Sequence, residues 1–435
     1  MSDLSRFFTH GMSIVIGILL LVIVTVSLLR TVVVPRPLRS NYSDAVTGIV
    51  IGSTRLIARI RREYRDRDAV LSWGGPILIL ALLLSWLLGY LAAYTFLEFG
   101  ASTDRSLAQA FRQAGSNLLT LGMGGSHDGS ITVIDFMAAA TGPIVIAMLI
   151  AFLPSVYSSY LERERIMVEL AIIAGDPIWA PEWLVRAHIA DSLDELIANF
   201  DAYADWATNL RLTHSTYPVL LHIRSPRFTR HPITTLLAML DAANLLASLS
   251  SKVSHRQVFT MIINGSQAVE VLYVLFFAHR TKRSRIPILG RFLEPPLEAS
   301  ASEGPIPAWQ RGLAAVHQAS ARDAALGMEP WRRGSVNAEA EAEIGVTRPD
   351  FDRAVAMMRE AGVTIDRDVD QAWTMFRRIR TRYAFPACEI ARALTAVPTP
   401  WSGPRTGGIA TMWPTSVLEV LRSGAPVDPD RAADS

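Results

Sequence analysis

The sequence predicts an all-α membrane protein with three transmembrane helices, a re-entrant loop between the second and the third, and a mostly helical cytoplasmic domain after them. Hydrophobic residues make up 50 % of the 435-residue chain and charged residues 19 %, whereas soluble domains carry about 25 % charged residues. The long apolar runs all precede residue 160, and the remainder is ordinarily polar. A single cysteine, Cys388, excludes a disulfide framework within one chain.

Three apolar runs are long enough for a bilayer crossing, which takes about 20 residues. The first, Ser13–Val34, is interrupted only by Arg30 near its end. The second, Val70–Leu97, carries no charged side chain, and the third, Ile131–Tyr157, carries Asp135 near its start. The first run has an alternative interpretation as a cleaved signal peptide. The thin positive charge before it and the lack of an Ala-x-Ala site after it favour a membrane helix.

The distribution of arginine predicts the orientation of these helices. The stretch Pro35–Ala69 contains eight arginines, whereas Glu98–Ser130 contains two. The positive-inside rule places the first stretch in the cytoplasm and the second outside. The N-terminus is then outside, and the chain beyond about residue 160 is cytoplasmic. Only two of the 42 basic residues are lysines, a bias typical of a GC-rich bacterial genome, so we expect a multi-pass protein of the cell inner membrane.

The expected organisation follows from these runs and from changes in composition. An N-terminal membrane helix with a basic loop precedes a segment that holds the other two membrane helices. A cytoplasmic helical domain, a linker rich in Pro, Ala, Ser and Glu, a C-terminal helical segment and a disordered tail follow. The bounds are residues 1–69, 70–160, 161–289, 290–308, 309–423 and 424–435. Val258–Phe277 is apolar enough for a fourth span, but three polar residues interrupt it and favour a buried or inter-subunit helix.

Between the second and third apolar runs lies a helix that is too short to cross a bilayer. Ser106–Leu119 has moderate apolarity, and Ser102, Thr103 and Asp104 before it are candidate N-caps. A glycine-rich stretch, Thr120–Gly125, ends it. Non-helical backbone at membrane depth requires protein or a water-filled cavity around it, so a half-helix followed by such a stretch predicts a re-entrant loop. An ordinary external turn is the alternative interpretation of this stretch.

The composition of the stretch suits the coordination of a cation by backbone carbonyls. Successive carbonyls point the same way only where the backbone handedness alternates, and glycine adopts positive φ at little cost. Gly122 and Gly124 have the alternate spacing that this requires. The hydroxyl of Thr120 adds an oxygen ligand, and the C-terminus of the preceding helix carries a partial negative charge that favours a cation.

At these residues the chain resembles the pore domain of potassium channels, over about residues 70–160. That family has an outer helix, a pore helix, a Thr-Val-Gly-Tyr-Gly filter and an inner helix. The resemblance implies an ion filter at Thr120, Leu121, Gly122, Met123 and Gly124. Ala110 stands ten residues before Thr120, as in many members, whereas Met123 and Gly125 replace the family's tyrosine and acidic residue. The implied ligand is K⁺ or another monovalent cation.

Two further features bear on how such a pore works. Gly142-Pro143 lies near the position of the family's hinge glycine, and proline removes a helical hydrogen bond, so we expect a gating hinge there. The frequency of Gly and Pro in membrane helices is the alternative explanation. Asp135 either attracts cations to the outer mouth or is a simple interfacial carboxylate. One chain supplies one loop and a carbonyl ring needs about four, so this interpretation predicts a homotetramer in membrane lipid.

The sequence contains no motif that indicates an enzyme. Walker A, G-x-G-x-x-G, G-x-S-x-G and H-E-x-x-H sequences do not occur, and His214, His222 and His231 lack the spacing of a metal site. We expect no cofactor, no metal and, with a net charge of only +2, no nucleic-acid partner. The leading interpretation is a potassium-like cation channel. The alternative is a non-conducting membrane-anchored sensor or interaction protein with a helical cytoplasmic domain.

Overall fold

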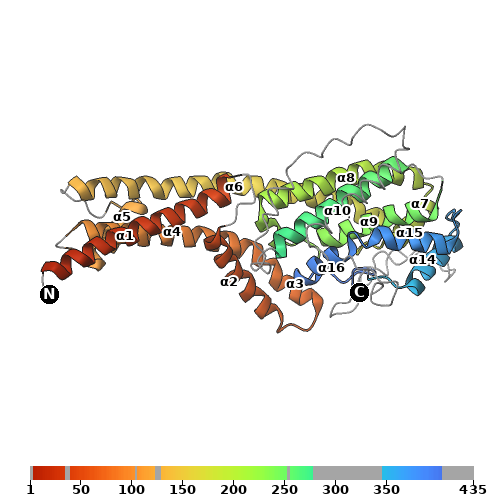
Figure 1. Cartoon of the computed structure of the whole chain (residues 1–435), viewed down its shortest axis with the longest axis horizontal. Helices are drawn as coiled ribbons and strands as arrows, with labels where there is room; N and C mark the ends of the chain where they lie inside the picture. Colours follow the sequence, from red (N-terminus) through yellow and green to blue (C-terminus); the bar gives the residue numbers. More distant parts are fainter. Residues whose placement is uncertain are drawn as a thin grey trace, which may run out of the picture. The chain divides into compact units, whose positions relative to one another are not determined.

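The computed structural model of the chain describes residues 3–34, 40–102, 105–122, 129–251, 255–277 and 345–403, and every regular element within these ranges is a helix (Figure 1). Five helices or helical stretches among them are long and apolar enough to cross a membrane. The described part of the chain is therefore all-α, and its apolar helices suggest a membrane protein. The expected linker 290–308 and tail 424–435 lie outside the described residues.

The chain divides into two compact units. The first comprises Met1–Leu161 together with Thr216–Arg224, and the second comprises Glu162–Ser215 and Ser225–Ser435. The elements of the first unit are α1 (Asp3–Leu28), η1 (Leu29–Val33), α2 (Asn41–Ala58), α3 (Tyr64–Ser72), α4 (Gly74–Ala101), α5 (Leu107–Leu118), the first part of α6 (Gly129–Ala174) and η2 (Pro218–His222). The return of η2 to the first unit is a feature that the sequence pattern did not predict.

α6 is one helix of 46 residues, which makes it about 70 Å long at 1.5 Å per residue. Its beginning agrees with the predicted third apolar run, but it continues through the charged stretch Leu161–Arg165 to Ala174. A bilayer's hydrocarbon core is about 30 Å thick, so this helix is longer than a crossing requires. The apolar run ends at the polar stretch, but the helix continues through it.

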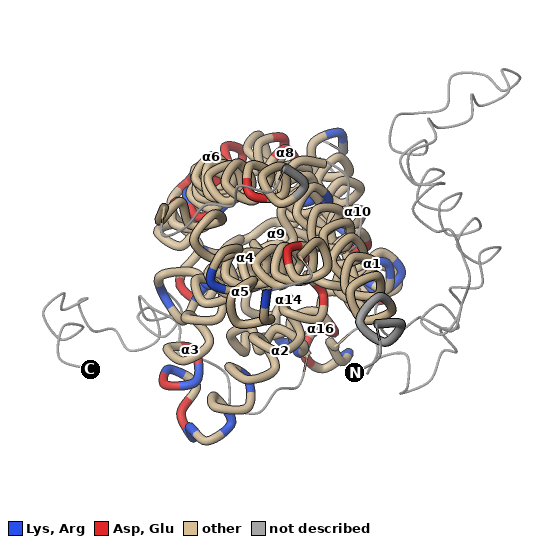
Figure 2. Tube along the Cα trace, turned by 90° about the vertical axis from the view of Figure 1, so that its left-hand side faces the viewer, with Lys and Arg blue, Asp and Glu red and all other residues tan. Residues whose placement is uncertain are grey.

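α2 and α3 form the charged end of the first unit. Ser40 caps α2 by accepting a hydrogen bond from Ser43 N at 3.4 Å. Six of the eight arginines of the predicted loop lie in α2, in α3 or in the turn between them, where Figure 2 shows basic and acidic residues side by side. The loop expected between the first two spans is therefore largely helical.

α1 and α4 pack antiparallel, and two glycines allow their close approach. A Cβ at Gly17 of α1 would lie 2.7 Å from Leu97 Cγ, and a Cβ at Gly89 of α4 would lie 2.6 Å from Val24 Cγ2. Small residues at an interface let membrane helices come together where no hydrophobic effect drives them. These two glycines thus fix the first helix against the second along most of its length.

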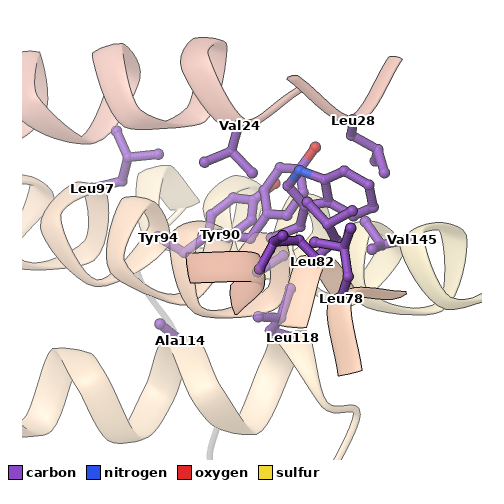
Figure 3. Close-up of a cluster of buried hydrophobic side chains, with 13 residues drawn as sticks. Val24, Leu28, Leu78, Leu82, Tyr90, Tyr94, Leu97, Ala114, Leu118 and Val145 are labelled. Carbon is purple, nitrogen blue, oxygen red and sulfur yellow. The ribbon is translucent and has the colours of Figure 1, made fainter. Parts of the chain in front are cut away.

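A cluster of buried apolar side chains fills the space between α1, α4, α5 and α6 (Figure 3). α5 contributes Ala114 and Leu118, and α6 contributes Val145. Within the cluster, Trp86 of α4 donates a hydrogen bond from Nε1 to Ser27 Oγ of α1 at 3.2 Å. A buried indole N–H without a partner would destabilise the packing, so this bond fixes the rotation of α4 relative to α1.

The second unit is a helical bundle built around a buried central helix. Its elements are the end of α6, α7 (Ala180–Ile189), α8 (Leu193–Thr216), α9 (Pro232–Leu249), α10 (His255–Phe277), α14 (Arg348–Glu360), α15 (Val369–Arg380) and α16 (Ala384–Ala393). Every residue of α9 is buried, and α7, α10, α15 and α16 pack against it. α10 also packs against α16. The apolar sequences of α9 and α10 are thus explained by packing within this unit.

A buried ion pair joins the C-terminal helices to α9. Arg380 donates from Nε and Nη2 to the carboxylate of Asp241 at 2.8 and 2.9 Å, and Tyr383 Oη donates to the same carboxylate at 2.7 Å. Arg380 also donates to Trp401 O at 2.7 Å. The described part of the expected C-terminal segment 309–423 therefore belongs to the same core as α9 and is not separate from it.

Replacing Asp241 by Asn should lower the free energy of unfolding by about 3–5 kcal/mol, because the Arg380 charge would stay buried without its counter-ion. Thermal unfolding of the purified protein measures this. The matched control is Asp352→Asn, which removes an exposed partner of Arg348 at 2.8 Å and should cost less than about 1 kcal/mol. Equal losses in the two variants would contradict the role given to the buried pair.

A second prediction concerns His214, which is buried in α8 with Nδ1 2.9 Å from Leu210 O. Burial, and then the charge of Arg163, lower the pKa of His214 to about 3. The unfolded chain takes up a proton below about pH 6.5 while the folded chain does not, so stability should fall as the pH drops from about 6.5 toward 3. His214→Gln should flatten the dependence of the melting temperature on pH between 7 and 5.

Candidate functional site

α5 is a short helix held between two long ones, as the sequence predicted. Its 12 residues span about 18 Å, roughly half of a bilayer's hydrocarbon core. Ser106 begins it with a capping box, in which Ser106 Oγ accepts from Gln109 N at 3.3 Å and Gln109 Oε1 accepts from Ser106 N at 2.8 Å. One face, with Ala110 and Leu118, is buried, and α5 packs against α4. The cap lies two residues after Asp104, the last of the three predicted candidates.

The end of α5 is a left-handed turn that closes on the helix. Thr120 N donates to Asn117 O at 3.0 Å and Leu121 N donates to Ser116 O at 2.7 Å, which is the double hydrogen bond of a Schellman motif. Thr120 has φ +56° and Gly122 has φ +67°. Left-handed backbone therefore occurs at alternate residues. The positive φ of Gly122 was predicted, whereas that of Thr120 was not.

Positive φ at Thr120 has a cost, because a β-branched side chain crowds the backbone in the left-handed region. The Thr120 hydroxyl donates to Leu119 O at 2.8 Å. Leu119 and Leu121 are 51 % and 57 % exposed, so this segment lies on the surface of the single chain. Of the five predicted filter residues, Met123 and Gly124 lie outside the described residues.

Asp135 near the start of α6 ties that helix to α5. Its Oδ1 accepts from Asn117 Nδ2 at 2.5 Å and its Oδ2 accepts from Gln113 Nε2 at 3.4 Å. The carboxylate thus clamps two side chains one turn apart on α5. Neither of the two roles considered for Asp135 in the sequence, attraction of cations or a plain interfacial charge, includes this positioning contact.

Glu98, in the last turn of α4, is a residue that sequence reasoning missed. It is fully buried, with the side chains of Asp135 and Asn117 next to its carboxylate. Its carboxylate interacts electrostatically with the charges of Asp135 and Arg105. Its signal in the sequence was a carboxylate directly after an apolar run, because ionisable groups at such positions in membrane proteins are expensive and functional.

A polar cleft lies along α5. It has a volume of about 260 Å³ and is lined by Arg105, Gln109, Arg112, Gln113 and Ser116. Gln113 belongs both to this cleft and to the clamp on Asp135. The clamp therefore adjoins a space that water can enter.

Gly142 of α6 is in close contact with the end of α5. A Cβ at this position would lie 1.8 Å from Leu118 O, so only glycine permits the contact. The neighbouring Thr141 Oγ1 lies 2.7 Å from Tyr94 Oη of α4, and Pro143 has no N–H to donate to the carbonyl one turn earlier. α6 nevertheless runs through both residues as one helix. The predicted hinge pair is therefore also the point of closest contact with α5.

Comparison of the chain with protein-family models, with curated proteins and with solved structures finds no match. The resemblance to potassium-channel pore domains thus depends on the sequence pattern of residues 70–160 alone.

Replacing Gly142 by Ala should displace the end of α5 from α6, because no rotation of a side chain relieves a clash between a Cβ and a backbone carbonyl. We expect the melting temperature to fall by several degrees and the amide exchange of residues 116–122 to accelerate. Gly48→Ala is the matched control, since a Cβ there meets nothing within 4 Å in the middle of α2. It should stabilise the protein by about 0.5–1 kcal/mol. A Gly142→Ala protein as stable as the wild type would contradict the contact.

Proposed function

We propose that the chain is one subunit of a homotetrameric, potassium-like cation channel in the cell inner membrane. The observation that carries the proposal is the alternation of left-handed backbone at Thr120 and Gly122, directly after a half-length helix between two apolar helices. Alternating handedness aims successive carbonyls at one side. The exposure of this segment in the single chain agrees with a site that four subunits complete together.

In the proposed mechanism, a cation sheds its water and binds the carbonyl oxygens of Thr120, Leu121, Gly122 and Met123. The C-terminal end of α5 adds a partial negative charge next to this path. Four such loops around one axis supply a full ring of oxygens. Movement of α6 near Gly142 and Pro143 controls the flow, because the contact with Leu118 links any bend there to the end of α5.

The proposed topology has three crossings, formed by α1, α4 and the first part of α6, with the loop of α5 between the last two. α9 is excluded as a crossing because protein surrounds it on all sides, and α10 packs against α9 and α16. In this topology the arginines around the α2–α3 turn favour a cytoplasmic position for that turn. The N-terminus is then outside, and the second unit is cytoplasmic.

A second candidate function is a non-conducting membrane-anchored sensor or interaction protein. The exposed apolar side chains of Ile172 and Ile173 favour it, since they are 74 % and 50 % exposed near the end of α6 in the second unit. Apolar side chains exposed next to each other outside a membrane indicate a partner. Cross-linking in native membranes separates the two functions, because monomers or dimers alone cannot form a ring of four loops.

Purified protein in liposomes with a K⁺/Na⁺ gradient should give a reversal potential near that of K⁺. Gly122→Ala should shift it toward zero or abolish the current, because alanine at φ +67° costs about 1–2 kcal/mol and turns the carbonyl. Gly115→Ala is the matched control, since its Cβ would make only an ordinary contact with Leu91 at 3.5 Å.

An unchanged reversal potential in Gly122→Ala would contradict the assignment of the filter. A folded wild-type tetramer that carries no current under any gradient would contradict the channel itself.

A further inference from the structure

α2 exposes an apolar stripe that the described residues do not cover. Ile49 and Leu56 lie two turns apart on α2 and are 70 % and 65 % exposed, and Ile60, in the turn just after the helix, is 77 % exposed. The opposite face packs against α4, where Ile51 Cδ1 lies 3.4 Å from the position of a Cβ on Gly74. One face thus packs on a membrane helix while the other stays open. A helix with this division and with arginines at its end is typical of elements that lie in the membrane interface.

The end of this helix belongs to a cluster of arginines in the first unit. Arg55 and Arg59 come from α2, and Arg224 comes from the segment just after η2. Arg224 Nη1 lies 2.6 Å from Asp68 Oδ1, with both side chains about nine-tenths buried. Asp68 is thus the ion-pair partner of Arg224, and the charges of Arg224 and Arg59 both act on Arg55.

Arg55 and His222 are two groups of this region whose pKa values are lowered partly by neighbouring arginines. Burial, and then the charges of Arg224 and Arg59, lower the pKa of Arg55. Burial, and then the charges of Arg55 and Arg224, lower the pKa of His222. A half-buried site that disfavours additional positive charge favours the binding of an anion.

The cluster lies at the level where α4 begins. A Cβ on Gly75 would lie 2.8 Å from Ile223 Cγ1 and 3.2 Å from His222 O, so the absence of a side chain there lets the segment before Arg224 rest against the first turn of α4. Trp73, just before α4, is 66 % exposed. Tryptophan is enriched where membrane helices meet water, so the arginines lie at head-group depth.

We propose that Arg55, Arg59 and Arg224 bind the phosphate of an anionic phospholipid, while the exposed stripe of α2 rests on its acyl chains. Guanidinium groups bind phosphate oxygens in pairs of parallel hydrogen bonds. The apolar stripe next to the cluster favours a lipid over a free phosphate ion, because only the lipid has acyl chains that can contact the stripe. The site depends on the membrane location of the chain and not on conduction.

The test compares full-length protein in nanodiscs of phosphatidylcholine with nanodiscs that also contain phosphatidylglycerol. Anionic lipid should raise the melting temperature of the wild type, because a ligand that binds only the folded state stabilises it. In Arg55→Gln/Arg59→Gln this rise should shrink at least twofold, while the melting temperature in phosphatidylcholine stays at the wild-type value. Arg353→Gln/Arg392→Gln, with exposed arginines of the second unit, should keep the full rise.

Equal rises in the wild type and in Arg55→Gln/Arg59→Gln would overturn the proposal. An equal stabilisation of the wild type by inorganic phosphate in pure phosphatidylcholine would assign the site to a free anion and overturn it as well. If the double variant is unstable in both lipids, Arg59→Gln alone is measured, because its exposed side chain lies outside the packed face. A bimane label on Ser53→Cys should be quenched by lipids with brominated acyl chains, and lack of quenching would contradict the position of the stripe.

Discussion

The contact between the carbonyl of Leu118 and the bare Cα of Gly142 is the constraint on which the first unit depends. A backbone oxygen that close to another helix leaves no room for a side chain, so α5 has one seat on α6 and no other. The clamp of Asn117 and Gln113 on Asp135 acts two turns before that seat on α6. Two contacts at different heights fix both the depth and the direction of α5. These two contacts therefore also determine the position of the turn that follows α5.

Buried polar groups decide the pairing of helices in both units. In the first, an indole N–H reaches a serine hydroxyl between α1 and α4. In the second, an arginine and a tyrosine from the C-terminal helices meet one aspartate on α9. Apolar side chains pack in many arrangements, whereas a buried donor or charge is stable only in an arrangement that gives it a partner. The apolar stripes bring helices together, and these few groups select the register.

Much of the helical framework was predictable from apolar runs. The predicted runs Val70–Leu97 and Ile131–Tyr157 begin within a turn of α4 and α6, and the predicted helix Ser106–Leu119 agrees with α5 to within a residue. The continuation of α6 to Ala174 was not predicted, because hydropathy reports a change of solvent and not the end of a helix. The helices inside the basic loop were missed for the same reason.

The candidate site was predictable only in part. The spacing of Gly122 and Gly124 predicted positive φ at alternate residues. Among the described residues, the second position with positive φ is Thr120, where the end of α5 requires a left-handed residue. Glu98 and the clamp on Asp135 depend on contacts between residues far apart in sequence. His231 likewise proved to cap α9, with Nδ1 accepting from Ile233 N at 3.2 Å, a role that spacing alone does not reveal.

The threonine at the end of α5 has an evolutionary consequence. Glycine or asparagine would terminate this helix at a lower conformational free energy, and a single-base change is enough to reach asparagine from half of the threonine codons. A chain selected only for folding would drift toward those residues. A β-branched residue in this left-handed bend therefore lowers the stability of the helix end relative to either of them, while its hydroxyl donates to Leu119 O.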